Sequence, residues 1–320
     1  MHENEILATF PALFATGDPS VLVGSGPDDC AHIRPGAEQL AFSTDAFAEG
    51  SHFLPDECPR AVARKALLAS LSDLAASACR PRWALVSLCL KKGLPESWST
   101  EFAVGLAEAA REYEVAIVGG DVISSRDGIF VSVTVAGVPL PGGPVLRGGG
   151  RPGDAVVVTG ELGGSIRGRH LSPAPRVREI ALLMEFCSGL EGGENLPDAA
   201  MDISDGLALD LSRMCRESGT GAVIHGDKIP VSPAATASAA ESGRKPVEHA
   251  LADGEDFELL LALPPRVWEA FAAFLASPEA PRGLAPFTRI GELTAAEGLR
   301  IVDADGSVRP LDPQGYQHQW

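Results

Sequence analysis

Residues 27–53 read PDDCAHIRPGAEQLAFSTDAFAEGSHF, and the rest of the chain is organised around this stretch. An acidic pair opens it, and a short apolar run then leads into a group of hydroxyls and carboxylates; the members are Asp28, Asp29, Ser43, Thr44 and Asp45. Such oxygen ligands at the end of a predicted strand suit Mg²⁺ better than Zn²⁺. The alternative interpretation is two acidic surface turns, because aspartate is common in turns.

Four later acidic places strengthen the metal interpretation. Asp73 lies in the apolar helical sequence ALLASLSDLAASA, where a buried carboxylate without a partner would be costly. It therefore needs a metal, a cation or several donors, unless it caps another helix. The other three places stand at predicted element ends: Asp121 after AIVGG, the group Asp202, Ser204 and Asp205 before a helix, and the DGED sequence of residues 253–256.

Together these acidic clusters predict one phosphate-binding site with several metal ions. The chain has no GxxxxGK[ST] loop and no HRD or DFG sequence, so phosphoryl transfer would depend on metal ions and positioning. Arg147, in a glycine-rich segment, is the candidate cation for a polyphosphate. The alternative is that Arg147 is a solvent-exposed linker residue.

The composition narrows the class of protein. The chain has 320 residues and a net charge of −17, which argues against nucleic-acid binding through a general basic surface. No apolar run reaches the roughly 18 residues of a membrane span, and MHENEILATF does not resemble a secretory signal. Six cysteines without a CxxC pair are typical of reduced thiols. We therefore expect a cytoplasmic protein with no membrane or nucleic-acid partner.

Hydrophobic periodicity and turn residues predict an α+β fold. The sequence PLPGGPVLRGGGRPG, residues 139–153, is the best domain boundary, so we expect an N-terminal domain at residues 1–140 and a C-terminal domain at 141–320. The alternative is one domain with a long surface loop. The predicted helices cover residues 3–15, 59–79, 95–113, 176–188, 206–217 and 233–242. The predicted strands cover residues 83–90, 115–118, 129–138, 155–159, 222–224, 258–263, 287–292 and 299–303.

Nine segments, in order from Ser25 to His318, resemble a known family. They are GPDDCAHI, AFSTDAFAEGSHFLP, RKALLASLSDLAA, VGGDVISS, RGGGRPGDAVVVTG, RHLSPAPR, MDISDGLALDL, GEDFELL and GYQH. The chain resembles the thiamine-monophosphate kinases, whose superfamily includes aminoimidazole ribonucleotide synthetase, selenophosphate synthetase and a hydrogenase maturation factor.

The resemblance implies ATP-dependent phosphorylation of thiamine monophosphate to thiamine diphosphate by direct in-line transfer. It implies two α/β domains of the aminoimidazole ribonucleotide synthetase type, whose N-terminal halves pair into a homodimer. ATP is the co-substrate, several Mg²⁺ ions are bound, and K⁺ is a possible further ion. We expect the two-fold pairing to use strands at residues 85–90 and 131–135.

The resemblance also assigns roles by motif position. Eight residues would hold metal ions: Asp29, Ser43, Thr44, Asp45, Asp73, Asp121, Asp202 and Asp205. Four would contact ATP: Gly120, Asp121, Arg147 and Ser204. His52 and Glu255 would contact the thiamine phosphate, and Pro313 stands where the family often has an aromatic residue beside the substrate. The segment Ile166–Gly168 is shorter than in the family and would alter the wall of the site.

Two other functions remain open at this stage. One is a different ATP-using enzyme of the same superfamily, acting on another small acceptor. The other is a catalytically silent nucleotide-binding scaffold, although the complete set of acidic clusters argues against it. ATP consumption with thiamine monophosphate, measured with and without Mg²⁺, would separate the three.

Overall fold

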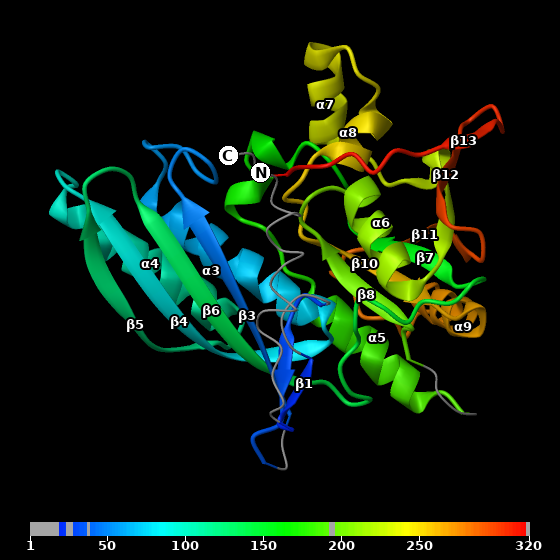
Figure 1. The fold of residues 1–320 in the computed structure, drawn as a ribbon, viewed down its shortest axis with the longest axis horizontal. Coiled ribbons are helices and arrows are strands. Elements are labelled where there is room, and N and C mark those ends of the chain that lie inside the picture. The colour runs from blue at the N-terminus through cyan, green and yellow to red at the C-terminus, as the bar shows by residue number, and fades with distance from the viewer. Residues whose placement is uncertain (1–18, 24–27, 37–38, 192–195, 318–320) are drawn as a thin grey trace.

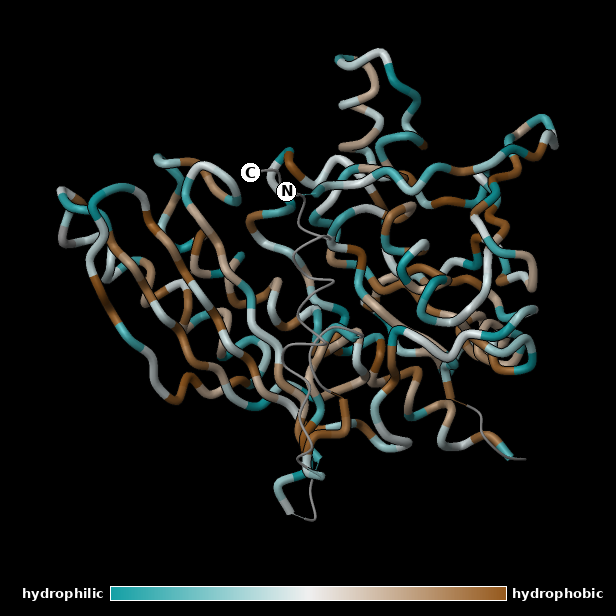
Figure 2. Tube along the Cα trace, viewed as in Figure 1, coloured by the Kyte–Doolittle hydropathy of each residue, from teal (hydrophilic) through white to brown (hydrophobic). Residues whose placement is uncertain are grey.

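The computed structural model describes residues 19–23, 28–36, 39–191 and 196–317. The helix expected at residues 3–15 lies outside the described residues. Two mixed sheets stand side by side, each with helices packed on it (Figure 1). Apolar segments run along the strands of both sheets, and the connections between strands are largely hydrophilic (Figure 2). The α+β prediction is confirmed.

The first sheet has six strands in the order β1-β2-β3-β6-β4-β5. Two helices, α3 (Pro59–Ala76) and α4 (Glu96–Glu112), cover one of its faces. Pro at the start of α3 and the Ala- and Leu-rich sequence after it favour this long helix. The strands are β1 (Val21–Val23), β2 (Ala31–Ile33), β3 (Leu40–Ala48), β4 (Cys79–Lys91), β5 (Ala116–Ser125) and β6 (Phe130–Pro139).

The second sheet has seven strands in the order β13-β12-β9-β11-β7-β10-β8. One face packs against α5 (Val177–Gly189) and α9 (Pro265–Leu275), and the other packs against α6 (Leu207–Ser218) and α8 (Pro246–Ala252). Helix α7 (Pro233–Ser242) and three short 3₁₀ turns complete this half: η1 (Ser165–Arg167), η2 (Arg169–Leu171) and η3 (Gly226–Lys228). The strands are β7 (Ala155–Thr159), β8 (Ala199–Ile203), β9 (Gly221–His225), β10 (Glu258–Leu263), β11 (Phe287–Thr294), β12 (Gly298–Val302) and β13 (Val308–Pro310).

Helix α3 joins the two halves. Most of its length packs in the core of the first sheet, while Ala75 and Ala76 at its end belong to a core shared with α5 and α9. The connection between β6 and β7 contains the expected boundary at residues 140 and 141, and the exact position of that boundary stays a prediction. No described helix is long and apolar enough to cross a membrane.

Two strands are longer than the sequence predicts. We expected a strand to end before Ser43, but β3 pairs with β6 as far as Ala48. We also expected a strand to end at Val118, but β5 continues through Gly120 to Ser125. The glycine is needed because any Cβ at Gly120 would lie 2.0 Å from the carbonyl oxygen of Val86 on β4. Close packing of two strands, not the end of a strand, explains this glycine.

Residues 85–90 and 131–135 cannot form a backbone ladder with a second copy, although packing of these strands face to face across a two-fold axis stays a prediction. These residues belong to β4 and β6, and each of these strands already has a partner on both sides. Only the two edge strands of a sheet can form a backbone ladder with another chain, and among the described strands of this sheet they are β1 and β5.

Candidate active site

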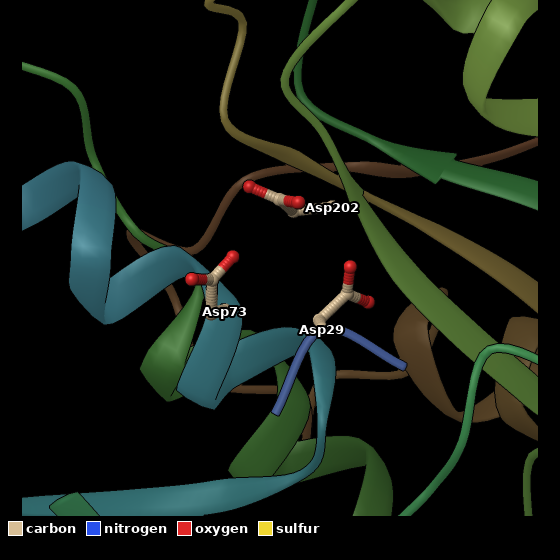
Figure 3. Close-up of side chains that lie close together, drawn as sticks. All are labelled: Asp29, Asp73 and Asp202. Atoms are coloured by element: carbon tan, nitrogen blue, oxygen red, sulfur yellow. The ribbon is translucent and has the colours of Figure 1, made fainter. Parts of the chain in front are cut away.

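Three carboxylates from separate parts of the chain meet between the two halves. Asp29 precedes β2, Asp73 lies in the last turns of α3, and Asp202 lies on β8. One carboxylate oxygen of each lies within 4.8 Å of the other two, and the three side chains point toward one another (Figure 3). We call these three residues the carboxylate cluster. The sequence prediction that Asp73 has a metal, a cation or several donors stays a prediction, since one donor to its side chain is seen here, the hydroxyl of Ser43.

The contacts of the cluster leave it short of positive charge. The hydroxyl of Ser43 donates to Asp73, and the guanidinium of Arg147 pairs with Asp29. Within the part of the chain that the structure describes, Asp73 and Asp202 have no ion pair, and the buried Oδ2 atom of Asp29 has no hydrogen-bond partner. Three carboxylates thus share one arginine.

Burial and mutual repulsion raise the pKa values of the Asp73 and Asp202 carboxyl groups. Burial is the largest cause for Asp73 and Asp202, and the neighbouring aspartates add to it. The pKa of Asp45, which lies beside Asp73, is raised in the same way. A divalent cation would remove both costs, because it supplies charge and replaces water as the partner of the oxygens. The donor set therefore fits Mg²⁺.

A cavity of about 690 Å³ extends from the cluster between the two halves. Its walls contain seven of the residues predicted from the sequence: Asp45, His52, Asp73, Asp202, Ser204, Asp205 and Glu255. The short turn η1 contributes Ser165 and Ile166 to the wall, at the segment that is shortened relative to the family resemblance. A cavity of this size accommodates a small organic phosphate.

His52 and Glu255 reach the cavity from opposite halves. The backbone N–H of Ala48 donates to Nδ1 of His52 at 3.0 Å, so a neutral ring carries its proton on Nε2. His52 can then act as a hydrogen-bond donor. Glu255 has a left-handed backbone with φ of 61°, and its N–H donates to the carbonyl of Ser204 at 2.6 Å. This conformation is rare for a residue other than glycine and is often found at functional sites.

Three predicted residues lie away from the cluster within one chain. Thr44 is on the opposite face of β3 from Asp45, and its hydroxyl lies 3.0 Å from that of Thr134. Gly120 and Asp121 are on the exposed edge strand β5. Asp45 and Gly120 share one row of the sheet, three interstrand spacings or about 14 Å apart. One ion cannot bind to both ends of that row.

Two further predictions differ from the structure in detail. Arg147 is not an exposed linker residue, because its side chain is mostly buried against Asp29 and its N–H donates to Asp28 at 2.9 Å. Pro313 is exposed and does not line the cavity, whereas Gly315 and Tyr316 do. The N–H of Tyr316 donates to the carbonyl of Asp205 at 2.9 Å, which turns the end of the chain toward the cavity.

Sequence reasoning missed several residues of the site. Lys65 is almost fully buried and pairs with Glu255. His249 also lines the cavity, and its Nδ1 atom lies 3.0 Å from a carboxylate oxygen of Asp253, the first residue of the predicted DGED sequence. A lysine inside the apolar sequence of α3 was the available signal for the first. For His249, the available signal was its i, i+4 spacing from Asp253, but such pairs are common in helices.

Comparison with known proteins agrees with this architecture. The family described as AIR synthase related protein, N-terminal domain, matches residues 27–139, and its C-terminal domain family matches residues 151–304. A thiamine-monophosphate kinase of Rhodopirellula baltica is 39% identical over 94% of this chain and 92% of its own length. The Escherichia coli K12 enzyme of that name is 33% identical over 91% and 90%.

The chain belongs to the thiamine-monophosphate kinase family. Among solved structures, AaThiL complexed with AMPPCP and TMP superposes with a TM-score of 0.81, at 29% identity, over 99% of this chain and 97% of that one. The resemblance seen in the nine sequence segments is therefore confirmed, and so are the two domains of the AIR synthase type.

Proposed function

We propose that this thiamine-monophosphate kinase family member transfers the γ-phosphate of ATP to thiamine monophosphate, giving thiamine diphosphate and ADP. The observation that carries the proposal is the cavity, which has the carboxylate cluster at one end and His52 and Glu255 on its walls. The relatives named for this activity, and the related structure with AMPPCP and TMP, support the choice of substrates.

The proposed transfer is a direct in-line displacement. An oxygen of the acceptor's phosphate attacks the γ-phosphorus of ATP, and the bond to the β–γ bridging oxygen breaks, with its electron pair leaving on ADP. Both reactants are anions, so the site has to hold them in line and offset their repulsion. The Nε2 proton of His52 is placed to donate to the acceptor's phosphate, and Glu255 to accept from its ring or amino group.

Asp29, Asp45, Asp73 and Asp202 would hold Mg²⁺. When bound, the metal supplies the positive charge that phosphate oxygens need during transfer. The side chains of Asp205 and Arg213 form an ion pair at 2.5 Å beside this region, so Asp205 already has one cationic partner in the chain. The metal roles of Ser43, Thr44, Asp121 and Asp205 stay predictions, as do the ATP contacts of Gly120, Asp121, Arg147 and Ser204.

We also propose a homodimer, formed through the outer face of the first sheet. Helices cover the other face, but Leu85, Phe130 and Ile123 project from the outer face and are 47%, 43% and 58% exposed. Asp121 lies on this same outer face. An exposed apolar surface of this kind marks an interaction site. A second copy packed here would bring its own Asp121 into the interface.

The test of the activity is ADP formation with thiamine monophosphate and ATP, followed by detection of thiamine diphosphate. We expect turnover with Mg²⁺, none in EDTA, and almost none in a folded Asp45→Asn variant. ADP formation with another acceptor alone would overturn the substrate assignment.

Light scattering of wild type and Leu85→Glu tests the dimer, since the charged variant should be a monomer. The cytoplasmic location and a K⁺ requirement stay predictions.

A further inference from the structure

Lys65 is a buried cation that has no role in the phosphoryl transfer proposed above. It lies on α3 between apolar neighbours, and its side chain is 1% exposed. Burying an ammonium group is costly unless it is paired and hydrogen-bonded. The structure supplies two partners, and both belong to the candidate acceptor site.

The Nζ atom of Lys65 bridges the two halves of the molecule. It donates to the carbonyl oxygen of His52 at 2.6 Å and pairs with Oε1 of Glu255 at 2.6 Å. His52 lies in the loop after β3, and Glu255 lies in the loop before β10. One ammonium group thus fixes the separation of the two residues proposed to contact the acceptor.

The Glu255 contact has a consequence for recognition. Its side chain is 28% exposed and lines the cavity, but one of its two oxygens is occupied by Lys65. Its backbone is held in a left-handed conformation by the N–H bond to Ser204. The carboxylate therefore presents one oxygen to a ligand from a fixed direction. This suits a single N–H donor, such as an amino group on a ring, better than a forked guanidinium.

We propose that Lys65 is a positioning residue for the acceptor, holding the Glu255 carboxylate and the His52 loop in the geometry that binds an amino-bearing organic phosphate. The proposal rests on the proposed kinase function. It assigns Lys65 no contact with ATP, because its partners lie on the walls that contain His52 and Glu255 and not at the carboxylate cluster.

The test is steady-state kinetics of Lys65→Met, which keeps the length of the side chain and removes the charge. We expect the KM for thiamine monophosphate to rise about tenfold to hundredfold, the range for losing hydrogen bonds to a charged group, while the KM for ATP stays within about twofold. Glu255→Gln should give a similar change. The double variant should show less than the sum of the two single effects, because the Lys65–Glu255 pair is lost in both single variants.

Arg176→Met is the matched control. Arg176 also pairs with a buried carboxylate near the start of β10, that of Glu258, but neither residue lines the cavity. A general loss of order around β10 would raise the acceptor KM in this control as well, and would overturn the proposal. So would a folded Lys65→Met with an acceptor KM within twofold of wild type, or additive effects in the double variant.

If circular dichroism shows that Lys65→Met is unfolded, Lys65→Gln replaces it under the same criteria, since its amide can still donate to the carbonyl of His52. The wild-type measurement separates a failure of the proposed function from a failure of the role proposed for Lys65. Wild type without thiamine monophosphate turnover overturns the proposed function, whereas normal wild-type turnover with unchanged variant KM values overturns only the role of Lys65.

Discussion

Two regions of this molecule with buried or partly buried carboxylates differ in the partners of these groups. In the first region, the carboxylate cluster of Asp29, Asp73 and Asp202 shares the single arginine Arg147. In the second, each carboxylate has an arginine of its own, Arg169 for Asp256 and Arg176 for Glu258. We call the second set the tether pairs, because they join the RHLSPAPR segment to the start of β10.

The difference separates a structural role from a catalytic one. A carboxylate with a matched guanidinium is already neutralised and can be buried for stability or positioning. A group of carboxylates without enough cations is unstable by itself, and a folded protein keeps such an arrangement where a metal ion or substrate supplies the charge. The comparison predicts that mutations in the carboxylate cluster lower activity without lowering stability, whereas mutations in the tether pairs lower stability.

The largest effect is expected from Asp73→Asn in the carboxylate cluster. The variant should lose activity by about 10²-fold to 10³-fold or more, because a ligand charge that supports phosphoryl transfer is removed. In the absence of metal it should be at least as stable as wild type, because the amide relieves repulsion with Asp45 and Asp202. Coupled ADP assays and thermal melts in EDTA measure the two quantities.

Asp227→Asn, an exposed surface change, is the control for Asp73→Asn. Mg²⁺ should raise the melting temperature of wild type and of this control, by the equivalent of about 2.7 kcal/mol at a hundred times the dissociation constant. Asp73→Asn should show much less of this shift. A variant that is active, or one that gains the same stability from Mg²⁺, would remove Asp73 from the metal site.

The next effect is expected in the tether pairs. Arg176→Met leaves the buried Glu258 without its guanidinium, which should lower the free energy of unfolding by about 3–5 kcal/mol in urea titrations. Arg176→Met with Glu258→Leu should recover part of the loss, because no buried charge is then unpaired. Neither variant should change the dependence of activity on Mg²⁺. If Arg176→Met is as stable as wild type, the tether pairs do not have the structural role assigned to them.

The carboxylates of the cluster could be predicted from the sequence better than the arginine partners in the tether pairs. Asp73 could be found because a charged residue in an apolar helix needs a partner, and the acidic groups around Asp45 and Asp202 stood close to predicted elements. The pairing of Arg176 with Glu258 joins residues 82 positions apart. Nothing local in either segment indicates which of the chain's arginines turns toward that carboxylate.

Two expected positions at the site differ from the structure, and each difference has a physical cause. The resemblance gave Gly120 and Asp121 roles at the metal and ATP site, but tertiary pairing extends β5 through them, so they lie away from the cluster within one chain and their roles stay predictions. We chose Pro313 by alignment with an expected aromatic position, whereas the backbone bond from Tyr316 to Asp205 brings a later residue to the cavity. Both depend on contacts between distant segments, which periodicity and turn chemistry do not specify.

A smaller effect is expected at a third arrangement, the neighbouring carboxyl groups of Asp154 and Asp198. Burial raises the pKa of Asp154 to about 6, and a hydrogen bond with Asp198 adds to this. Because its folded pKa lies above its ordinary value of 3.8, the folded state binds the proton more tightly. This stabilisation is complete below about pH 4 and is lost as the pH rises through 6.

Asp198→Asn should flatten this pH dependence, since an amide can donate to an ionised Asp154 and no shared proton is needed. Melting temperatures between pH 4 and 8, for wild type and for the exposed-site variant Asp227→Asn, provide the reference slope. If all three proteins show the same slope, the pair does not share a proton in the folded state. Asp154 and Asp198 would then resemble the tether pairs, in which an arginine neutralises the carboxylate, and Arg151 near Asp198 would be the cation.

The smallest effect concerns Tyr316, which lines the cavity. Its ring is half exposed, and its backbone is anchored to Asp205, so it can cover a bound aromatic acceptor. An aromatic contact contributes about 0.5–1.5 kcal/mol, so Tyr316→Ala should raise the KM for thiamine monophosphate by at most about tenfold, with kcat unchanged. Tyr316→Phe should keep the wild-type KM, and Pro313→Trp should not lower it, because Pro313 lies off the cavity wall. A lower KM in Pro313→Trp together with an unchanged KM in Tyr316→Ala would return the aromatic contact to position 313.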